Sequence, residues 1–228
     1  MNPTHRLLSL LAVAFAFCQP AAAEGEKRPP LKTGDIVFQQ TATSASDAIM
    51  LASGTKYTHV GIVELDKQGH PNVIEAVGPV RITPLDTWIK NGTGKRVTVK
   101  RIKGLSEANA KAALADAHRY LGRPYDHFFY ESRDQIYCSE LVHLAFKDGA
   151  NISLGKEEKV RDLKIDTGAA QKLIAQRWKA HPLCKSKGAA NFKACYALIL
   201  DQTLVTPASI ARDPQMELVY TNFGDDAE

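Results

Sequence analysis

Short runs of β-branched and other apolar residues, each bounded by Gly, Pro, Asp or Asn, mark the first half of the chain. This pattern predicts five strands, at residues 35–40, 58–64, 72–77, 80–83 and 96–102. Residues 41–53 begin with small polar side chains and are predicted to form a short helix over the sheet. Residues 84–92 are predicted to be a turn or a single helical turn.

The pattern changes near residue 105, where apolar positions begin to recur at helical spacing. Helices are predicted over residues 106–121, with Ser106 as the cap, and from Cys138 to about Lys147. A closing strand is predicted at residues 216–222. Strands followed by helices and a last strand favour an α+β fold class.

The segment between residues 151 and 203 has a different character. Residues 151–166 are rich in charged side chains and are predicted to be loop, residues 167–179 can form a third helix, and residues 180–195 are basic. Thr206 and Pro207 then match the start of another helix, because Thr caps a helix and Pro fits its first turn.

Residues 1–23 have the parts of a secretory signal peptide. A basic start precedes an apolar run over residues 7–17, and Ala21-Ala22-Ala23 supplies the small residues of a cleavage site. The run is shorter than the ~20 apolar residues that span a bilayer, and no other long apolar run follows it. We therefore expect cleavage near Ala23, no stable membrane anchor, and a periplasmic or secreted product. The alternative is a buried N-terminal helix.

Composition and charge exclude several classes of protein. Hydrophobic residues make up 44% of the 228 residues and charged residues 24%, which excludes a disordered chain, a collagen and a coiled coil. The formal net charge of +4 is small, so no nucleic-acid partner is expected. The length indicates one domain, assigned to residues 34–228 after a flexible leader at residues 24–33; the sequence leaves the oligomeric state open.

Removal of the signal segment, which contains Cys18, leaves three cysteines, Cys138, Cys184 and Cys195. An odd number in an oxidising compartment leaves one thiol unpaired or paired with another chain. Cys184 and Cys195 lie close together in a basic segment and are predicted to form a disulfide. Cys138 is then the unpaired thiol.

Cys138 falls at the predicted first turn of a helix. The positive end of the helix dipole lowers the pKa of a thiol there, and a backbone N–H can hold an oxyanion nearby. These properties are typical of a nucleophilic cysteine. The alternative is a buried cysteine that packs with Leu141 and Val142 on the apolar stripe of the helix.

His59 lies on the strand predicted at residues 58–64, two residues before Gly61, which permits close approach of another backbone. If residues 65–69 form a hairpin loop, His59 lies directly opposite Glu75 and shares its face of the sheet. A carboxylate beside an imidazole orients it, as in a triad of nucleophile, base and orienting residue. A slip of one residue would put Glu75 on the other face, and a lone strand histidine is often structural.

Metal and cofactor sites have no support in the sequence. No pair of histidines has a spacing such as HExxH, no CxxC is present, and no Gly-rich phosphate loop is present. His181, which precedes a proline, gives no signal of its own. We expect no metal and no cofactor.

Five segments carry a family resemblance: GDIVFQQ (34–40), YTHVGIV (57–63), VIEAVGPVRITPL (73–85), LGRPYD (121–126) and YCSELV (137–142). Together they resemble the YiiX-like permuted papain-like hydrolases, which form part of the circularly permuted branch of the NlpC-type cell-wall amidase superfamily. TPASIARDP (206–214) is similar to the family's ending. Residues 151–203 depart from the pattern and are predicted to be an insertion or a divergent region.

The resemblance implies a circularly permuted papain-like α+β fold, with an antiparallel sheet or small barrel packed on helices. It places the histidine strand before the cysteine helix, and implies Cys138 as nucleophile, His59 as base and Glu75 as the third member. Tyr125 and Asp126 are candidates to line the cleft, where Asp126 could meet a substrate amine or form a turn.

The expected function is that of a cysteine amidase or peptidase that cleaves an amide, for example in cell-wall peptides, through an acyl-enzyme. Two alternatives remain. One is a lipid acyltransferase or thioesterase of the lecithin:retinol acyltransferase type, which would need an apolar channel. The other is a catalytically silent module that binds the cell envelope.

The signal segment generates a first prediction. Because the small residues end at Ala23, the exported protein should begin at Glu24 and carry no lipid. Intact-mass measurement of the exported protein checks this. Retention of residues 1–23, or a diacylglyceryl group on Cys18, would contradict it.

Overall fold

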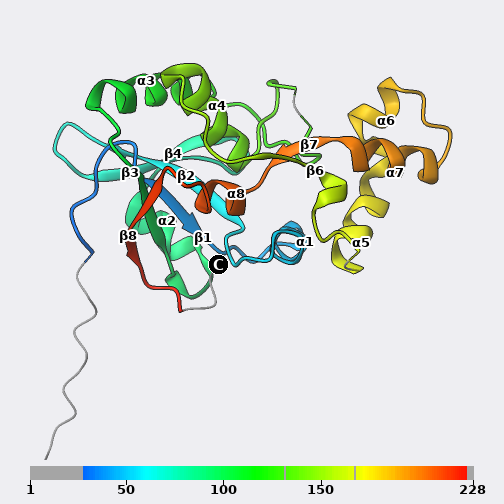
Figure 1. Ribbon diagram of the computed structural model, residues 1–228, viewed down its shortest axis with the longest axis horizontal. Coiled ribbons are helices and arrows are strands. Elements are labelled where there is room, and N and C mark those ends of the chain that lie inside the picture. The colour runs from blue at the N-terminus through cyan, green and yellow to red at the C-terminus, as the bar shows by residue number, and fades with distance from the viewer. Residues whose placement is uncertain (1–27, 131, 167, 225–228) are drawn as a thin grey trace, which may run out of the picture.

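A six-stranded antiparallel sheet with strand order β4-β3-β2-β1-β5-β8 forms the body of the protein (Figure 1). The computed structural model describes residues 28–130, 132–166 and 168–224, so the predicted signal segment lies outside the described residues. The strands are β1 (Ile36–Gln39), β2 (His59–Leu65), β3 (Pro71–Ala76), β4 (Val80–Pro84), β5 (Thr98–Ile102) and β8 (Met216–Thr221). All six predicted strands are present within two residues of their predicted bounds.

Eight α-helices are present in the described part of the chain: α1 (Ser44–Ser53), α2 (Leu85–Asn91), α3 (Glu107–His118), α4 (Cys138–Ala150), α5 (Gly168–Arg177), α6 (Pro182–Ser186), α7 (Phe192–Asp201) and α8 (Pro207–Ala211). Three short 3₁₀ segments, η1 (Thr93–Lys95), η2 (Val160–Asp162) and η3 (Trp178–Ala180), accompany them. The Ser106 hydroxyl caps α3 by accepting the Asn109 N–H, as predicted, and Thr206 caps α8 in the same way with Ser209. The helix predicted over 106–121 ends earlier, at His118, and α2 is longer than a single turn.

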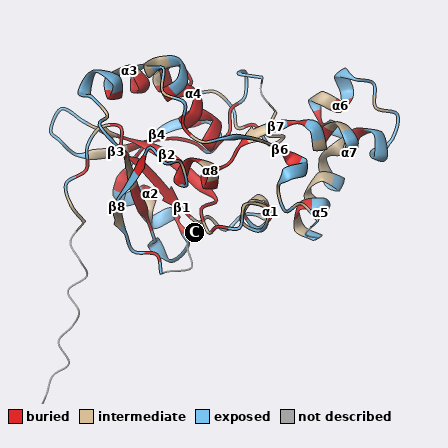
Figure 2. Cartoon of the chain, in the orientation of Figure 1, coloured by how far each residue is buried: buried red, intermediate tan, exposed pale blue. Residues whose placement is uncertain are grey.

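Apolar side chains cover both faces of the sheet, so its inner strands are mostly buried, whereas the edge strands β4 and β8 are partly exposed (Figure 2). Alternate residues of a strand point to opposite faces. On β1, Ile36 and Phe38 join the core under α4, whereas Val37 joins a second core with Trp88 of α2. The first core also takes in Leu141 and other apolar side chains of α4, and α3 packs along that helix.

Residues 160–202, here called the helical extension, form a separate cluster at one end of the molecule (Figure 1). Its small core contains Val160, Ile199 and the predicted disulfide between Cys184 and Cys195. Two short strands that the sequence analysis missed, β6 (Glu157–Lys159) and β7 (Thr203–Val205), pair with each other where the extension leaves and rejoins the body. The prediction of loop over residues 151–166 is therefore wrong at β6, because that strand depends on a partner more than 40 residues away.

The hairpin between β2 and β3 has a different register from the predicted one. Leu65 pairs with Pro71, so the loop covers residues 66–70 rather than 65–69. The Asp66 carboxylate accepts the Gln68 and His70 N–H groups and holds this turn. If this register is continued along the two strands, Glu75 lies opposite Gly61. His59 is then the diagonal neighbour of Glu75. Because the register differs by an even number of residues, both side chains still share one face.

Gly61 generates a second prediction. A Cβ there would lie 2.4 Å from Val73 Cγ1 and 2.9 Å from the Ile74 carbonyl oxygen, which is too close. Gly61→Ala should lower the free energy of unfolding by about 1–3 kcal/mol. Gly168→Ala is the matched control, because nothing lies within 4 Å of that Cβ, and should change stability by less than about 0.5 kcal/mol. Urea denaturation of both variants checks this; equal effects would contradict it.

Candidate active site

Cys138 is the first residue of α4, and long-range contacts hold that end of the helix in place. The Tyr137 N–H donates to the Glu140 carboxylate at 3.3 Å, which caps the first turn. From β7, the Val205 N–H donates to the Tyr137 hydroxyl at 3.1 Å, and its carbonyl accepts the Ser139 hydroxyl at 2.8 Å. The thiol therefore has a defined position at a helix N-terminus.

His59 and Glu75 form a buried pair on the neighbouring strands β2 and β3. His59 Nε2 lies 2.7 Å from Glu75 Oε2, and the two residues are 5% and 2% exposed. The other carboxylate oxygen accepts hydrogen bonds from Thr83 at 2.6 Å and from Arg81 at 3.2 Å. Trp88 stacks on the imidazole with ring centroids 5.8 Å apart. These contacts fix the ring and leave its other nitrogen, Nδ1, for the thiol.

The Cys138 thiol and the His59 imidazole are hydrogen-bonded, and each changes the pKa of the other. Burial lowers the pKa of His59, but hydrogen bonds to Cys138 and Glu75 outweigh burial and raise it to about 9. Burial raises the pKa of Cys138, yet the hydrogen bond and charge of His59 bring it below the ordinary value. The N–H groups of Val60 and Ser139 also stabilise the thiolate. The favoured state is a thiolate beside an imidazolium.

The structure gives Tyr125 and Asp126 different surroundings. Burial raises the pKa of Tyr125 well above its ordinary value, and a hydrogen bond to Cys138 raises it further, so the phenol stays protonated beside the sulfur. The Asp126 carboxylate accepts the backbone N–H groups of Phe128 and Tyr130. Burial raises the pKa of this carboxyl, and these N–H groups partly offset the effect. Asp126 therefore shapes the loop over residues 127–130, which is the turn-forming alternative of the sequence analysis.

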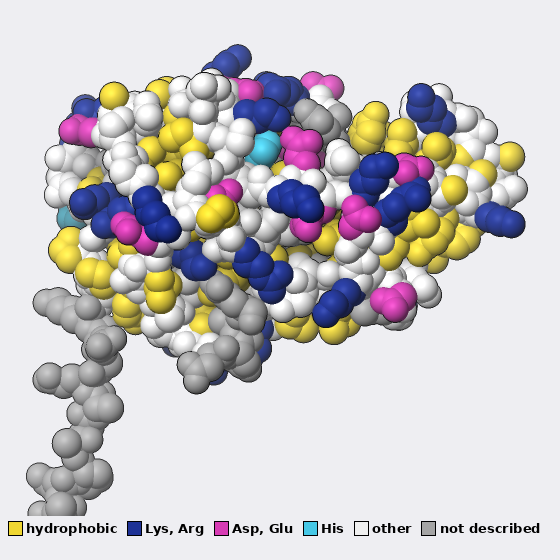
Figure 3. All heavy atoms as spheres, in the orientation of Figure 1, with side chains coloured by type: hydrophobic (Ala, Val, Ile, Leu, Met, Phe, Trp, Pro, Cys, Tyr) yellow, Lys and Arg dark blue, Asp and Glu magenta, His cyan; other side chains and the backbone are white. Residues whose placement is uncertain are grey.

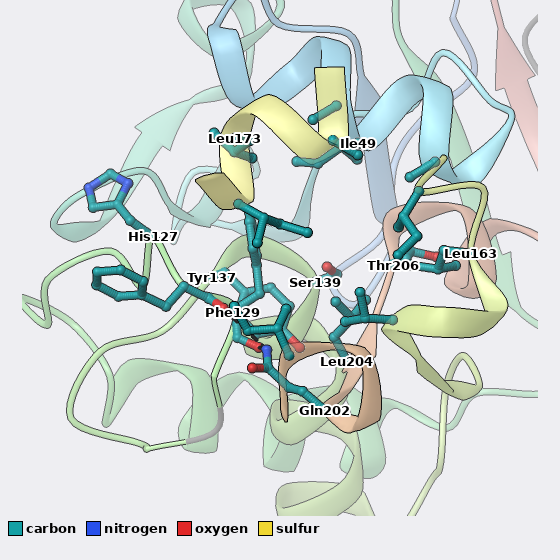
Figure 4. A pocket seen from close by; sticks show the side chains of 18 of the residues that line it. Ile49, His127, Phe129, Tyr137, Ser139, Leu163, Leu173, Gln202, Leu204 and Thr206 are labelled. Atoms are coloured by element: carbon teal, nitrogen blue, oxygen red, sulfur yellow. Dashed lines mark hydrogen bonds between the residues drawn. The ribbon is translucent and has the colours of Figure 1, made fainter. Parts of the chain in front are cut away.

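An apolar pocket leads from the helical extension to Cys138 and is open to solvent on one side (Figure 4). Apolar side chains from α1, α5 and β7 line it, among them Ile49, Leu173 and Leu204. Cys138 and Ser139 also line it, whereas His59 and Glu75 do not. Cys138 is therefore the residue that lines the pocket and also contacts the His59 imidazole, with the Glu75 carboxylate behind that imidazole.

Two buried polar residues of the pocket wall, His181 and Gln202, were not identified as candidate site residues by the sequence analysis. Both come from the helical extension and reach the loop over residues 127–130. A single Gln or His in such a segment matches no sequence motif that would mark it as a site residue. Their roles depend on contacts between parts of the chain 50 or more residues apart, which no local pattern records.

Three comparisons with known proteins each show a similarity of this chain to a known family or protein. Residues 30–220 match the family model of the permuted papain-like amidase enzyme, YaeF/YiiX, C92 family. The chain is 33% identical over 215 residues to the protein YiiX of Escherichia coli K12, described as uncharacterized, with 93% of each chain covered. It also matches a crystal structure of the metalloprotein yiiX from Escherichia coli O157:H7, with a TM-score of 0.74, 32% identity, and coverage of 86% of this chain and 99% of that one.

The thiol generates a third prediction. Because the pKa of Cys138 is lowered mainly through His59, iodoacetamide should alkylate Cys138 rapidly at pH 6 in the folded protein, well below the ~8.5 reference pKa of a free thiol. His59→Ala should slow alkylation by at least about tenfold. Glu75→Gln should have a milder effect, since it disturbs the orientation of the imidazole rather than removing it.

Peptide mapping by mass spectrometry gives these rates, and circular dichroism verifies that each variant is folded. A Cys138 that reacts only in denaturant, with a rate that His59→Ala does not change, would refute the assignment of a reactive thiol.

Proposed function

Because the chain belongs to the YaeF/YiiX family of permuted papain-like amidases, we propose that it is a cysteine amidase whose nucleophile is Cys138. The observation that carries this proposal is the buried His59, hydrogen-bonded to the thiol on one side and to the Glu75 carboxylate on the other. This is the arrangement of nucleophile, base and orienting residue that acyl transfer requires.

In the proposed reaction the Cys138 sulfur attacks the amide carbonyl carbon, and the carbonyl electrons move to its oxygen. The N–H of Cys138, at the first helical position, has no acceptor within the helix and can donate to this oxyanion. The protonated Tyr125 hydroxyl beside the sulfur is a second donor within reach.

The imidazolium of His59 then protonates the leaving amine as the carbon–nitrogen bond breaks. The neutral imidazole next removes a proton from water, which attacks the thioester and releases the acid. Glu75 accepts a hydrogen bond from His59 throughout and keeps Nδ1 directed at the reacting groups. Its own pKa, which burial raises, is lowered overall by the hydrogen bond from His59, so the carboxylate stays charged.

We place this activity in the periplasm or outside the cell, with a cell-wall peptide as the proposed substrate. The disulfide between Cys184 and Cys195 supports an oxidising compartment, where such bonds persist. No helix among the described residues is long and apolar enough to cross a membrane.

A metal has no part in this mechanism, although the related yiiX structure is described as that of a metalloprotein. Within the described residues, no three His, Cys, Asp or Glu side chains are grouped so that they could hold a metal ion. The Glu75 oxygens are also occupied by His59, Thr83 and Arg81. The donor set of the described residues therefore does not fit a metal site.

A second candidate function is acyl transfer or thioester hydrolysis on a lipid. The observation that favours it is the apolar pocket, because such an enzyme needs an apolar channel that reaches the nucleophile. The same thiol and imidazole would form the acyl-enzyme, and an alcohol or amine rather than water would then accept the acyl group.

Hydrolysis of defined substrates generates a fourth prediction. The protein should release acid and amine from purified murein peptides or from N-acyl amines, as read by mass spectrometry, and Cys138→Ala should abolish the release while leaving the fold intact. The value of kcat/KM should fall above pH about 9, because the general acid His59 loses its proton there.

A parallel assay with lipid thioesters or esters separates the two candidates. Turnover of these lipids without amide cleavage would favour the lipid enzyme. Absence of turnover on every substrate, together with an unreactive Cys138, would favour a binding module.

A further inference from the structure

The end of the apolar pocket beside the loop over residues 127–130 contains a cluster of polar side chains from the helical extension. Gln202 Nε2 donates to the Phe128 carbonyl at 3.2 Å and to the Phe129 carbonyl at 2.5 Å. The His181 imidazole also donates to the Phe128 carbonyl. Because both side chains reach one carbonyl group, their polar ends lie close together. Figure 4 shows Gln202 directed toward Phe129 and Tyr137 in the pocket wall.

Each of these two side chains retains an acceptor that has no partner among the described residues. These atoms are Gln202 Oε1 and His181 Nδ1, on residues that are 9% and 4% exposed. Burial lowers the pKa of His181, so the ring is neutral at pH 7 and carries one N–H. Since that N–H is directed at Phe128, Nδ1 is an acceptor. Buried acceptors without a donor are unfavourable, and a ligand that supplies donors relieves this cost.

The remaining pocket lining restricts the chemistry of such a ligand. Apart from Arg177, which donates to the His127 carbonyl at 2.7 Å, the histidines, and the Cys138 thiolate, whose charge His59 balances, the described lining residues are neutral and mostly apolar. No Asp or Glu is among them, so an ammonium group would lack a counter-charge. A neutral donor on an apolar chain matches this lining best.

We propose that Gln202 and His181 form a recognition site for a hydroxyl or amide N–H group carried by an apolar acyl chain that occupies the pocket. This inference rests on the proposed function only in placing the acyl carbonyl beside Cys138, and it takes N-acyl amines, rather than cell-wall peptides, as the substrates. It makes the helical extension the part of the protein that selects the acyl group. An unsubstituted chain would fill the same apolar space but leave both acceptors without donors.

Binding to the Cys138→Ala protein tests the proposal without turnover. The probes are N-acylglycines of one chain length, either unsubstituted or with a single hydroxyl group moved along the chain, and calorimetry measures each Kd. At least one hydroxylated probe should bind about tenfold more tightly than the unsubstituted probe. Gln202→Met and His181→Phe, each in the Cys138→Ala background, should reduce this preference to less than about threefold.

The ratio of the two Kd values is the decisive quantity, because loss of the bonds to the loop could weaken all probes equally. Gln171→Met, an exposed change on α5 outside the pocket, is the matched control and should keep the preference. Equal binding of all probes, no binding of any probe, or a preference that survives both pocket variants would overturn the proposal. The alkylation rate of Cys138 in the native protein separately reports whether the proposed catalytic function holds.

Discussion

The hydrogen-bonded contact between His59, Glu75 and Cys138 is the interaction on which the rest of the site depends. All three residues are buried, so each charge is unfavourable unless the others balance it. The imidazolium, with a pKa of about 9, offsets the burial of the thiolate, and the Glu75 carboxylate offsets the burial of the imidazolium. Removal of His59 would leave two buried anions without the cation between them, which makes the arrangement a single unit rather than three separate residues.

The fold supports this unit from three directions. The β2–β3 hairpin brings His59 and Glu75 to one face, with Gly61 allowing the strands to approach and Trp88 covering the ring. Helix α4 brings Cys138 with its N-terminal amides. The segment after the helical extension, through Val205, fixes the first turn of that helix. The same segment connects the proposed catalytic unit to the apolar pocket.

The helical extension has its own core and disulfide, yet it is not separate from the site. Helix α5 packs against α1, and Gln202 and His181 reach the loop over residues 127–130, so the pocket lies between the extension and the body. The pocket wall is apolar except for two buried acceptors, Gln202 Oε1 and His181 Nδ1. Such a wall can select a ligand by the hydrogen-bond donors of the ligand as well as by the shape of the ligand.

The hydrophobic pattern and the turn residues in the sequence were enough to predict the strands and most helix starts. They also predicted that the β2–β3 register places His59 and Glu75 on the same face of the sheet. Such features depend on neighbours a few residues apart, and the motifs around Cys138 then indicated the family. The tertiary structure decided the exact register, because the Asp66 turn moved the hairpin loop by one residue. It also decided that β6 pairs with β7 and that the Asp126 carboxylate holds a turn. The pocket that His181 and Gln202 line likewise exists only in the folded protein. These features depend on contacts between distant residues or on the local geometry of a loop, and the free energy of such contacts is not visible in a local pattern.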